Sequence, residues 1–131
     1  MSSRVKILCV DDDQEVLSVL TDILTWKGYE VATVGSGSAA VAQIGKRFDL
    51  IVVDYNLPDI NGDIVAERWK REHPNVPILM MSGCPTLPSR ALDFVNAHLT
   101  KGCEMNSLLG TVSELTKTYI DRNVVASAIG V

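Results

Sequence analysis

The sequence has no long hydrophobic run, no leader pattern and no basic cluster. None of its apolar stretches approaches the roughly 18 to 20 residues that a helix needs to cross a bilayer. The first apolar stretch, "VKILCV", is cut off by the acids Asp11, Asp12 and Asp13, which is unlike a signal peptide. We therefore expect a cytoplasmic protein without a membrane partner.

Basic residues and cysteines are also scarce. The chain has 12 Lys and Arg against 16 Asp and Glu, which gives a formal net charge of −4. Its cations are scattered, whereas a protein that binds a phosphate backbone needs a basic face, so we expect no nucleic-acid partner for this chain. Three cysteines, an odd number, do not suit a disulfide framework, and we interpret them as thiols.

What the sequence does contain is a repeated alternation of short apolar runs and segments with helical periodicity. Its 131 residues, 47% of them hydrophobic, suffice for one domain with a core. Asp13 is placed to cap the first helix and Gly28 to end it. The pattern predicts strands at 5–10, 29–34, 50–53, 76–82 and 97–100, and helices at 14–27, 38–47 and 63–72, with a last helix whose apolar positions lie between Leu108 and Ile120.

These strands are almost continuously apolar, which is typical of a parallel sheet covered by helices on both faces. The predicted fold class is therefore α/β, a doubly wound open (βα)5 sheet of five parallel strands. The segment between the fourth and fifth strands contains Pro85 and Pro88. We expect a short or irregular fourth helix there, spanning at most Ser89 to Asn96.

Charged and hydroxyl side chains follow four of the predicted strands. They are Asp11 to Asp13, Asp54, Ser82 and Lys101. In open α/β sheets, ligands bind beyond the carboxyl ends of the strands. Several carboxylates at one edge repel one another, and Mg²⁺, which prefers oxygen ligands, would offset that repulsion. A free oxygen of Asp54 could then attack phosphorus to give an aspartyl phosphate, with Lys101 and Ser82 holding the phosphoryl oxygens.

Four motifs in order, "VDDD", "DLIVVDYNLPDINGD", "PILMMSG" and "LTKG", resemble the receiver (CheY-like) domain of two-component response regulators. The resemblance covers about residues 4–122. It implies a flavodoxin-like sheet with strand order 2-1-3-4-5, a receiver domain at 1–122, and a C-terminal tail or the start of a linker at 123–131.

The resemblance also implies roles for individual residues. Asp54 would be the phosphoacceptor and, with Asp12, a direct ligand of Mg²⁺. Asp11 would contribute through water, and the backbone carbonyl of Asn56 would complete the protein ligands.

In the same way, Ser82 would hydrogen-bond the phosphoryl group and Lys101 would pair with it. The implied function is a signalling phosphoacceptor rather than an enzyme in the usual sense. It would take its phosphoryl group from a histidine kinase or a histidine phosphotransfer protein and switch conformation to regulate an output partner that the sequence does not identify. The resemblance also allows for a homodimer.

The sequence departs from the family at two positions in the last motif. Gly102 follows Lys101 where the family usually has proline, and we expect a trans peptide with an unusual φ at the glycine. His98 stands where the family usually places a Tyr or Phe that moves inward with Ser82. It is interpreted with equal weight as a switch residue and as an ordinary histidine at a strand end.

Two alternatives remain open. The departure at Gly102 and the short fourth helix also fit a receiver-like interaction module that does not cycle phosphate. An aspartyl-phosphate hydrolase would share the nucleophile and the metal, but it would carry a second acid two residues after Asp54, where this chain has Asn56.

Overall fold

The computed structural model describes residues 4–84 and 86–128, with residues 121–128 described by their backbone alone. Within this part of the chain, five parallel strands form one sheet in the order β2-β1-β3-β4-β5, which confirms the predicted fold class and strand order. The strands are β1 (Lys6–Val10), β2 (Glu30–Val34), β3 (Leu50–Asp54), β4 (Ile78–Ser82) and β5 (Ala97–Thr100). The helices are α1 (Gln14–Trp26), α2 (Gly37–Ala42), α3 (Gly62–Glu72) and α4 (Met105–Ala128), with a 3₁₀ segment η1 (Ser89–Leu92).

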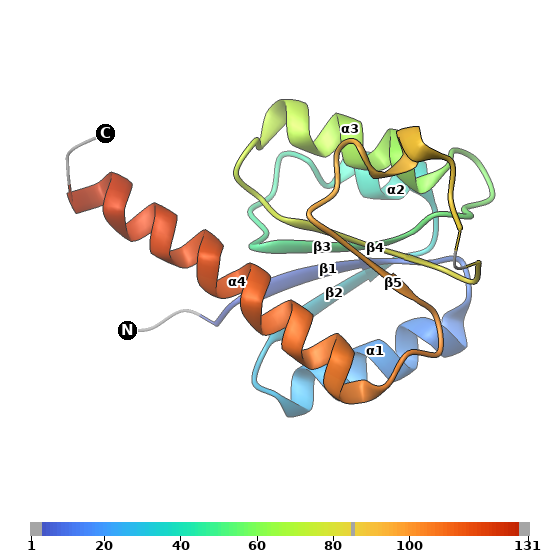
Figure 1. Cartoon of the computed structure of the whole chain (residues 1–131), viewed down its shortest axis with the longest axis horizontal. Helices are drawn as coiled ribbons and strands as arrows, with labels where there is room; N and C mark the ends of the chain where they lie inside the picture. Colours follow the sequence, from blue (N-terminus) through green and yellow to red (C-terminus); the bar gives the residue numbers. More distant parts are fainter. Residues whose placement is uncertain (1–3, 85, 129–131) are drawn as a thin grey trace.

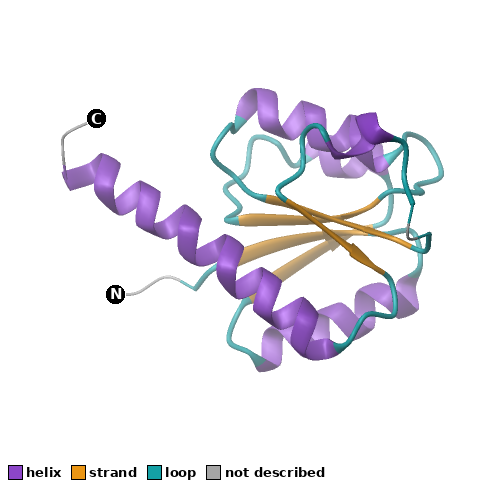
Figure 2. Cartoon of the chain, in the orientation of Figure 1, coloured by secondary structure: helices purple, strands orange, loops and turns teal. Residues whose placement is uncertain are grey.

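Helices cover both faces of the sheet. Figures 1 and 2 show α1 and α4 on one face, and α2, α3 and η1 on the other. The side chains of β1, β3 and β4 alternate between two hydrophobic cores, for example Ile51 and Val53 on the α3 side and Leu50 and Val52 on the α1 side. The edge strands β2 and β5 are only partly buried. The central strands therefore carry most of the burial that stabilises the fold.

The ends of α1 are as the sequence predicts. The carboxylate of Asp13 accepts hydrogen bonds from the backbone N–H groups of Glu15 (2.9 Å) and Val16 (3.4 Å). Gly28 follows the helix with a φ of 99°, a conformation that costs glycine little. Asp13 thus fixes where α1 begins, directly after the acidic residues that follow β1, and Gly28 marks where it ends.

Helix α2 is shorter than predicted, and the expected helix over 38–47 is wrong in its second half. The N–H of Gln43 bonds to the carbonyl of Ala40, and that of Ile44 to Val41, both at 3.1 Å, so the chain tightens into turns. From α3, the indole of Trp69 also donates to the carbonyl of Ala40 at 3.1 Å. Tertiary contacts thus end α2 at Ala42, although the helical pattern of the sequence continues to residue 47.

The segment before β5 confirms the prediction of a short fourth helix. Only the 3₁₀ turn Ser89–Leu92 forms there among the described residues, anchored by the buried side chain of Ala91. Beyond β5, Gly102 has a φ of 85°, and all peptide bonds in the described residues are trans. Both expectations about the Lys101-Gly102 bond are therefore confirmed.

The last helix continues past the domain boundary that the sequence predicts at residue 122. Helix α4 runs to Ala128 and projects beyond the sheet in Figure 1. The boundary stays a prediction, and residues 129–131 of the expected tail lie outside the described residues. No helix in the described part of the chain has the length and apolar character to cross a membrane. In the same part, Cys9, Cys84 and Cys103 are free thiols, as expected.

Candidate functional site

Three carboxylates meet at the carboxyl edge of the sheet. Strands β1 and β3 are neighbours, with Val10 opposite Val53, so the next residues, Asp11 and Asp54, lie side by side. One carboxylate oxygen each from Asp11, Asp12 and Asp54 lies within 4.8 Å of the others. Asp11 and Asp54 are 3% and 4% exposed, whereas Asp12 is exposed. The structure thus brings together the three acids that the sequence singles out.

The backbone holds the two buried acids in place. Asp11 accepts a hydrogen bond from the N–H of Asp13 at 2.9 Å, and Asp54 Oδ1 accepts one from the N–H of Asn56 at 3.3 Å. Sequence reasoning missed the part played by Gly62. The N–H of Gly62 bonds to the Tyr55 carbonyl at 2.7 Å, and a Cβ at Gly62 would overlap the Asp54 carbonyl. The loop after Asp54 can therefore close only over a glycine.

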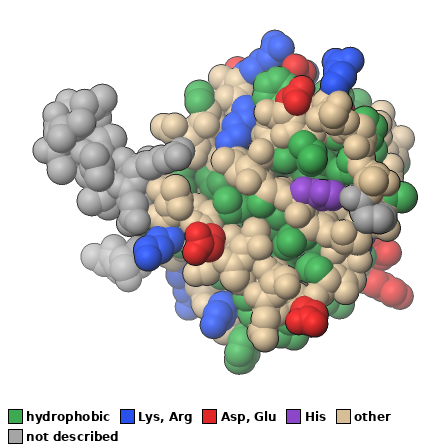
Figure 3. Space-filling model, in the orientation of Figure 1, with side chains coloured by type: hydrophobic (Ala, Val, Ile, Leu, Met, Phe, Trp, Pro, Cys, Tyr) green, Lys and Arg blue, Asp and Glu red, His purple; other side chains and the backbone are tan. Residues whose placement is uncertain are grey.

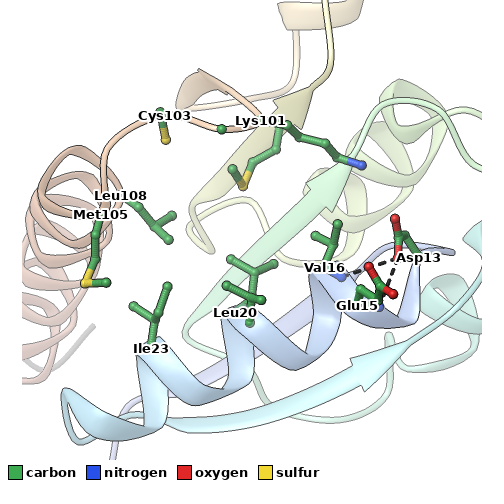
Figure 4. Close-up of a pocket in the computed structure, with 12 residues that line it drawn as sticks. Asp13, Glu15, Val16, Leu20, Ile23, Lys101, Cys103, Met105 and Leu108 are labelled. Carbon is green, nitrogen blue, oxygen red and sulfur yellow. Dashed lines mark hydrogen bonds between the residues drawn. The ribbon is translucent and has the colours of Figure 1, made fainter.

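Lys101 joins this acidic group from the end of β5. Its Nζ lies 2.8 Å from Asp11 Oδ2 and 3.0 Å from Asp54 Oδ2. The N–H of Lys101 bonds to the carbonyl of Ser82 at 2.7 Å, which ties its backbone to the end of β4. Figure 4 shows its side chain reaching from β5 toward the start of α1 near Asp13.

The electrostatics of the site follow from burial and close charges. Burial raises the pKa of Asp54 above its usual value, the neighbouring Asp11 adds to the rise, and the hydrogen bond from Lys101 opposes it. Burial would lower the pKa of Lys101, but its hydrogen bonds to Asp11 and Asp54 leave that pKa raised. The ammonium therefore stays charged and partly neutralises two carboxylates.

The residues present fit a hard divalent cation. Carboxylate oxygens are the ligands that Mg²⁺ prefers, and three of them converge here with one acid open to solvent. One ammonium faces two buried carboxylates, so the cluster keeps excess negative charge. Asp11, Asp12 and Asp54 would hold the ion. The part of the Asn56 carbonyl as a ligand stays a prediction.

The remaining site residues lie on the β4–β5 side. Ser82 is fully buried at the end of β4, and its hydroxyl contacts the carbonyl of Cys84 and the Nε2 atom of His98. One partner lies in the β4–η1 loop and the other on β5, and among the described residues the hydroxyl makes no hydrogen bond to the carboxylates. His98 is thus paired with Ser82, although its role as a switch stays a prediction.

An apolar groove adjoins the site between α1 and the start of α4. It has a volume of about 380 Å³ and reaches from Lys101 and Asp13 along α1. Figure 4 shows Leu20 and Ile23 of α1 facing Met105 of α4 across this groove. Met105 is half-exposed.

The face over β5 has a different character. In Figure 3, hydrophobic side chains and a histidine gather in the middle of this face, with charged side chains mostly toward its margins. Leu92 and Phe94, on and after η1, are among the exposed large hydrophobic residues of the chain.

Comparison with known proteins gives a consistent result. The family model of the response regulator receiver domain matches residues 7–113. The chain is 31% identical over 119 residues to the transcriptional regulatory protein TcrA of Mycobacterium tuberculosis, covering 88% of this chain and 47% of that protein. It thus spans about half the length of this curated relative.

Solved structures show the same fold. A CheY-like receiver domain protein from Methanospirillum hungatei superposes with a TM-score of 0.87 at 27% identity, covering 92% of this chain and 99% of that one. The response regulator TrrA of Thermotoga maritima, solved in complex with Mg²⁺-BeF, has a TM-score of 0.81 at 23% identity over 85% of this chain and 98% of that one. On the match to its family model and on its fold, the chain belongs to the response regulator receiver domains.

Proposed function

We propose that this receiver domain accepts a phosphoryl group on Asp54 from the phosphohistidine of a histidine kinase or phosphotransfer protein, in a Mg²⁺-dependent reaction. The observation that carries the proposal is the contact of Lys101 Nζ with both Asp11 and Asp54 beside the exposed Asp12. In this proposal Asp54 is the nucleophile, the ammonium of Lys101 balances its charge, and Asp11 and Asp12 are metal ligands at the same edge of the sheet. The domain then changes conformation and regulates a partner.

The transfer needs little beyond position and charge. A carboxylate oxygen of Asp54 forms a bond to phosphorus as the P–N bond of the donor breaks, and the donor histidine keeps the electron pair. Bound Mg²⁺ would neutralise negative charge on the phosphoryl oxygens. Asp11 and Asp12 would hold the ion together with Asp54, so the negative charge around the nucleophile would be neutralised.

Lys101 and Ser82 act on the phosphoryl group itself. Lys101 already touches Oδ2 of Asp54, and a phosphoryl oxygen in reach of its ammonium would gain a charge-assisted hydrogen bond. The hydroxyl of Ser82 would donate to another phosphoryl oxygen after its hydrogen turns from the carbonyl of Cys84. That turn links phosphorylation to the loop between β4 and η1.

The surfaces around the site indicate how partners meet the domain. A donor protein that presents its histidine to Asp54 would cover the adjoining apolar groove between α1 and α4. The output partner, or a second copy in a homodimer, would use the apolar face over β5 and η1. A cytoplasmic location, where such donors act, is part of the proposal.

The test is acceptance of phosphate from acetyl phosphate, followed by intact mass. We expect a single phosphate adduct on the wild type with Mg²⁺, and none with EDTA or in Asp54→Asn. Asp22→Asn, which changes an acid of α1 away from the site, is the matched control and should accept phosphate as the wild type does.

The second candidate, an interaction module that does not cycle phosphate, is favoured by one observation: the Ser82 hydroxyl is already bonded to the Cys84 carbonyl and to His98. A wild type that forms no adduct at any Mg²⁺ concentration would support that candidate and overturn the proposal.

A further inference from the structure

The hydroxyl of Ser82 has two close partners. Its Oγ lies 2.5 Å from the carbonyl oxygen of Cys84 and 3.1 Å from Nε2 of His98. Met80 pairs with His98 across β4 and β5, and Ser82 pairs with Thr100, so Ser82 and His98 lie on the same face of the sheet. The flanking residues Ala97 and Leu99 pack into the core on the other face. Sheet register therefore brings the imidazole to the serine.

Counting hydrogens fixes the direction of both bonds. A serine hydroxyl has one hydrogen, and a carbonyl oxygen can only accept. The short contact to the carbonyl of Cys84 therefore takes the hydrogen of Ser82. His98 must then donate from Nε2, because the Ser82 oxygen has only lone pairs left to offer. The arrangement requires the Nε2–H form of His98.

We propose that His98 is a positioning residue for Ser82, donating from Nε2 to its oxygen while the serine hydrogen exchanges between the Cys84 carbonyl and the phosphoryl group on Asp54. This role rests on the proposed function. Such a donor polarises the serine hydroxyl and strengthens the bond that the hydroxyl makes in turn. A phenylalanine ring at the same position can fill the space but cannot donate to Ser82.

The first test determines the tautomer of the His98 imidazole and needs no phosphorylation. In ¹⁵N-labelled protein, we expect NMR to show His98 as the Nε2–H tautomer when neutral. His73 is an internal control, since its Nε2 lies 2.6 Å from the carbonyl of Ile44 and must also donate. Ser82→Ala should shift the His98 nitrogen signals and leave those of His73 unchanged. A neutral His98 protonated on Nδ1 would overturn the proposal.

The second test asks whether His98 acts through Ser82. We compare the rate of phosphate acceptance from acetyl phosphate in His98→Phe, Ser82→Ala and the double variant. We expect His98→Phe to lower the rate about fivefold, the effect of one neutral hydrogen bond. The double variant should be no slower than Ser82→Ala, because the imidazole then has no hydroxyl to position. His98→Gln, which keeps an amide donor near the place of Nε2, should recover part of the rate.

The outcomes separate this role from the proposed function. An unchanged rate in His98→Phe, or losses that multiply in the double variant, would overturn the positioning role while phosphate acceptance stands. A wild type that forms no adduct would overturn the proposed function and the role in transfer with it. In that case the NMR result still decides whether His98 donates to Ser82.

Discussion

The two halves of the site are built differently. The acidic half stands on β1 and β3, whose side chains are almost completely buried, and backbone N–H groups hold the carboxylates of Asp11 and Asp54. The other half stands on the end of β4 and on β5, an edge strand that is only partly buried throughout. In this half the contacts are between side chains. His98 contacts Ser82, and Lys101 forms an ion pair with Asp11 of the acidic half.

We interpret this difference as a division between a fixed part, the acidic half, and a movable part, the half on β4 and β5. Chemistry at Asp54 needs ligands that do not shift, and strands inside a packed core provide them. A switch needs groups with two sets of partners of similar energy, which a hydroxyl and a long side chain on an edge strand can have. Lys101, 27% exposed, links the two parts.

The largest expected effect comes from the fixed half. Gly62→Ala places a methyl group against the Asp54 carbonyl, which is backbone and cannot move aside. We expect a loss of about 3 kcal/mol in the free energy of unfolding, the upper end for overpacking, and slower phosphate acceptance. Urea unfolding and intact mass measure the two effects.

A matched control lies in α4. Gly110→Ala adds the same methyl group in a helix, into open space, and should raise stability by about 0.5 to 1 kcal/mol. If Gly62→Ala were as stable as the wild type, the acidic half would be less rigid than its contacts indicate.

The next effect concerns the link between the halves. Lys101→Met removes the ammonium from two buried carboxylates. With EDTA present we expect this variant to lose about 2 kcal/mol in the free energy of unfolding, measured in urea. The loss is smaller than for a fully buried ion pair because Lys101 is partly exposed. Mg²⁺ should stabilise this variant more than it stabilises the wild type, since the ion then meets uncompensated acids.

Lys117→Met, at an exposed position of α4, is the control and should change stability by no more than about 0.5 kcal/mol. Equal effects of Mg²⁺ on Lys101→Met and on the wild type would show that Lys101 does not compensate the acids.

A smaller effect is expected in the movable half. Gly102 has a φ of 85°, and no atom of the described residues outside its immediate neighbours lies within 4 Å of the place that a methyl group would take. Gly102→Ala should therefore lower the free energy of unfolding by about 1 kcal/mol, through backbone strain alone. Unfolding in urea measures it. A loss as large as that of Gly62→Ala would mean that the β5–α4 turn is packed as tightly as the fixed half.

The two halves also differ in how well the sequence predicts them. Apolar strands that end in Asp11 and Asp54 predict both the sheet and the acids, since the carboxyl ends of parallel strands share an edge. The proline pair and Gly102 predict the short η1 and the turn. The family resemblance relates His98 to Ser82, but the hydrogen bond between them could not be predicted, because it depends on the register of β4 and β5.

Two further contacts escaped prediction for a related reason. The approach of Gly62 to the Asp54 backbone joins residues eight positions apart through a loop whose shape no periodicity specifies. The end of α2 depends on Trp69, which lies on another helix.

The smallest expected effect is a pH dependence that originates in the fixed half. Burial raises the pKa of Asp54 in the folded protein, so the folded state binds more protons than the unfolded state at pH values between the usual Asp pKa of about 3.9 and the raised one. Asp54 therefore contributes stability that is fully present below about pH 3.9 and is lost as the pH rises through its folded pKa.

Asp54→Asn lacks this titration. In EDTA, its free energy of unfolding should rise relative to that of the wild type as the pH increases from about 4 to 7, and Asp54→Ala should show the same slope relative to the wild type. Urea unfolding across this range measures the difference. Parallel curves would mean that Lys101 compensates Asp54 fully and that the cluster, without an ion, carries no excess charge for Mg²⁺ to neutralise.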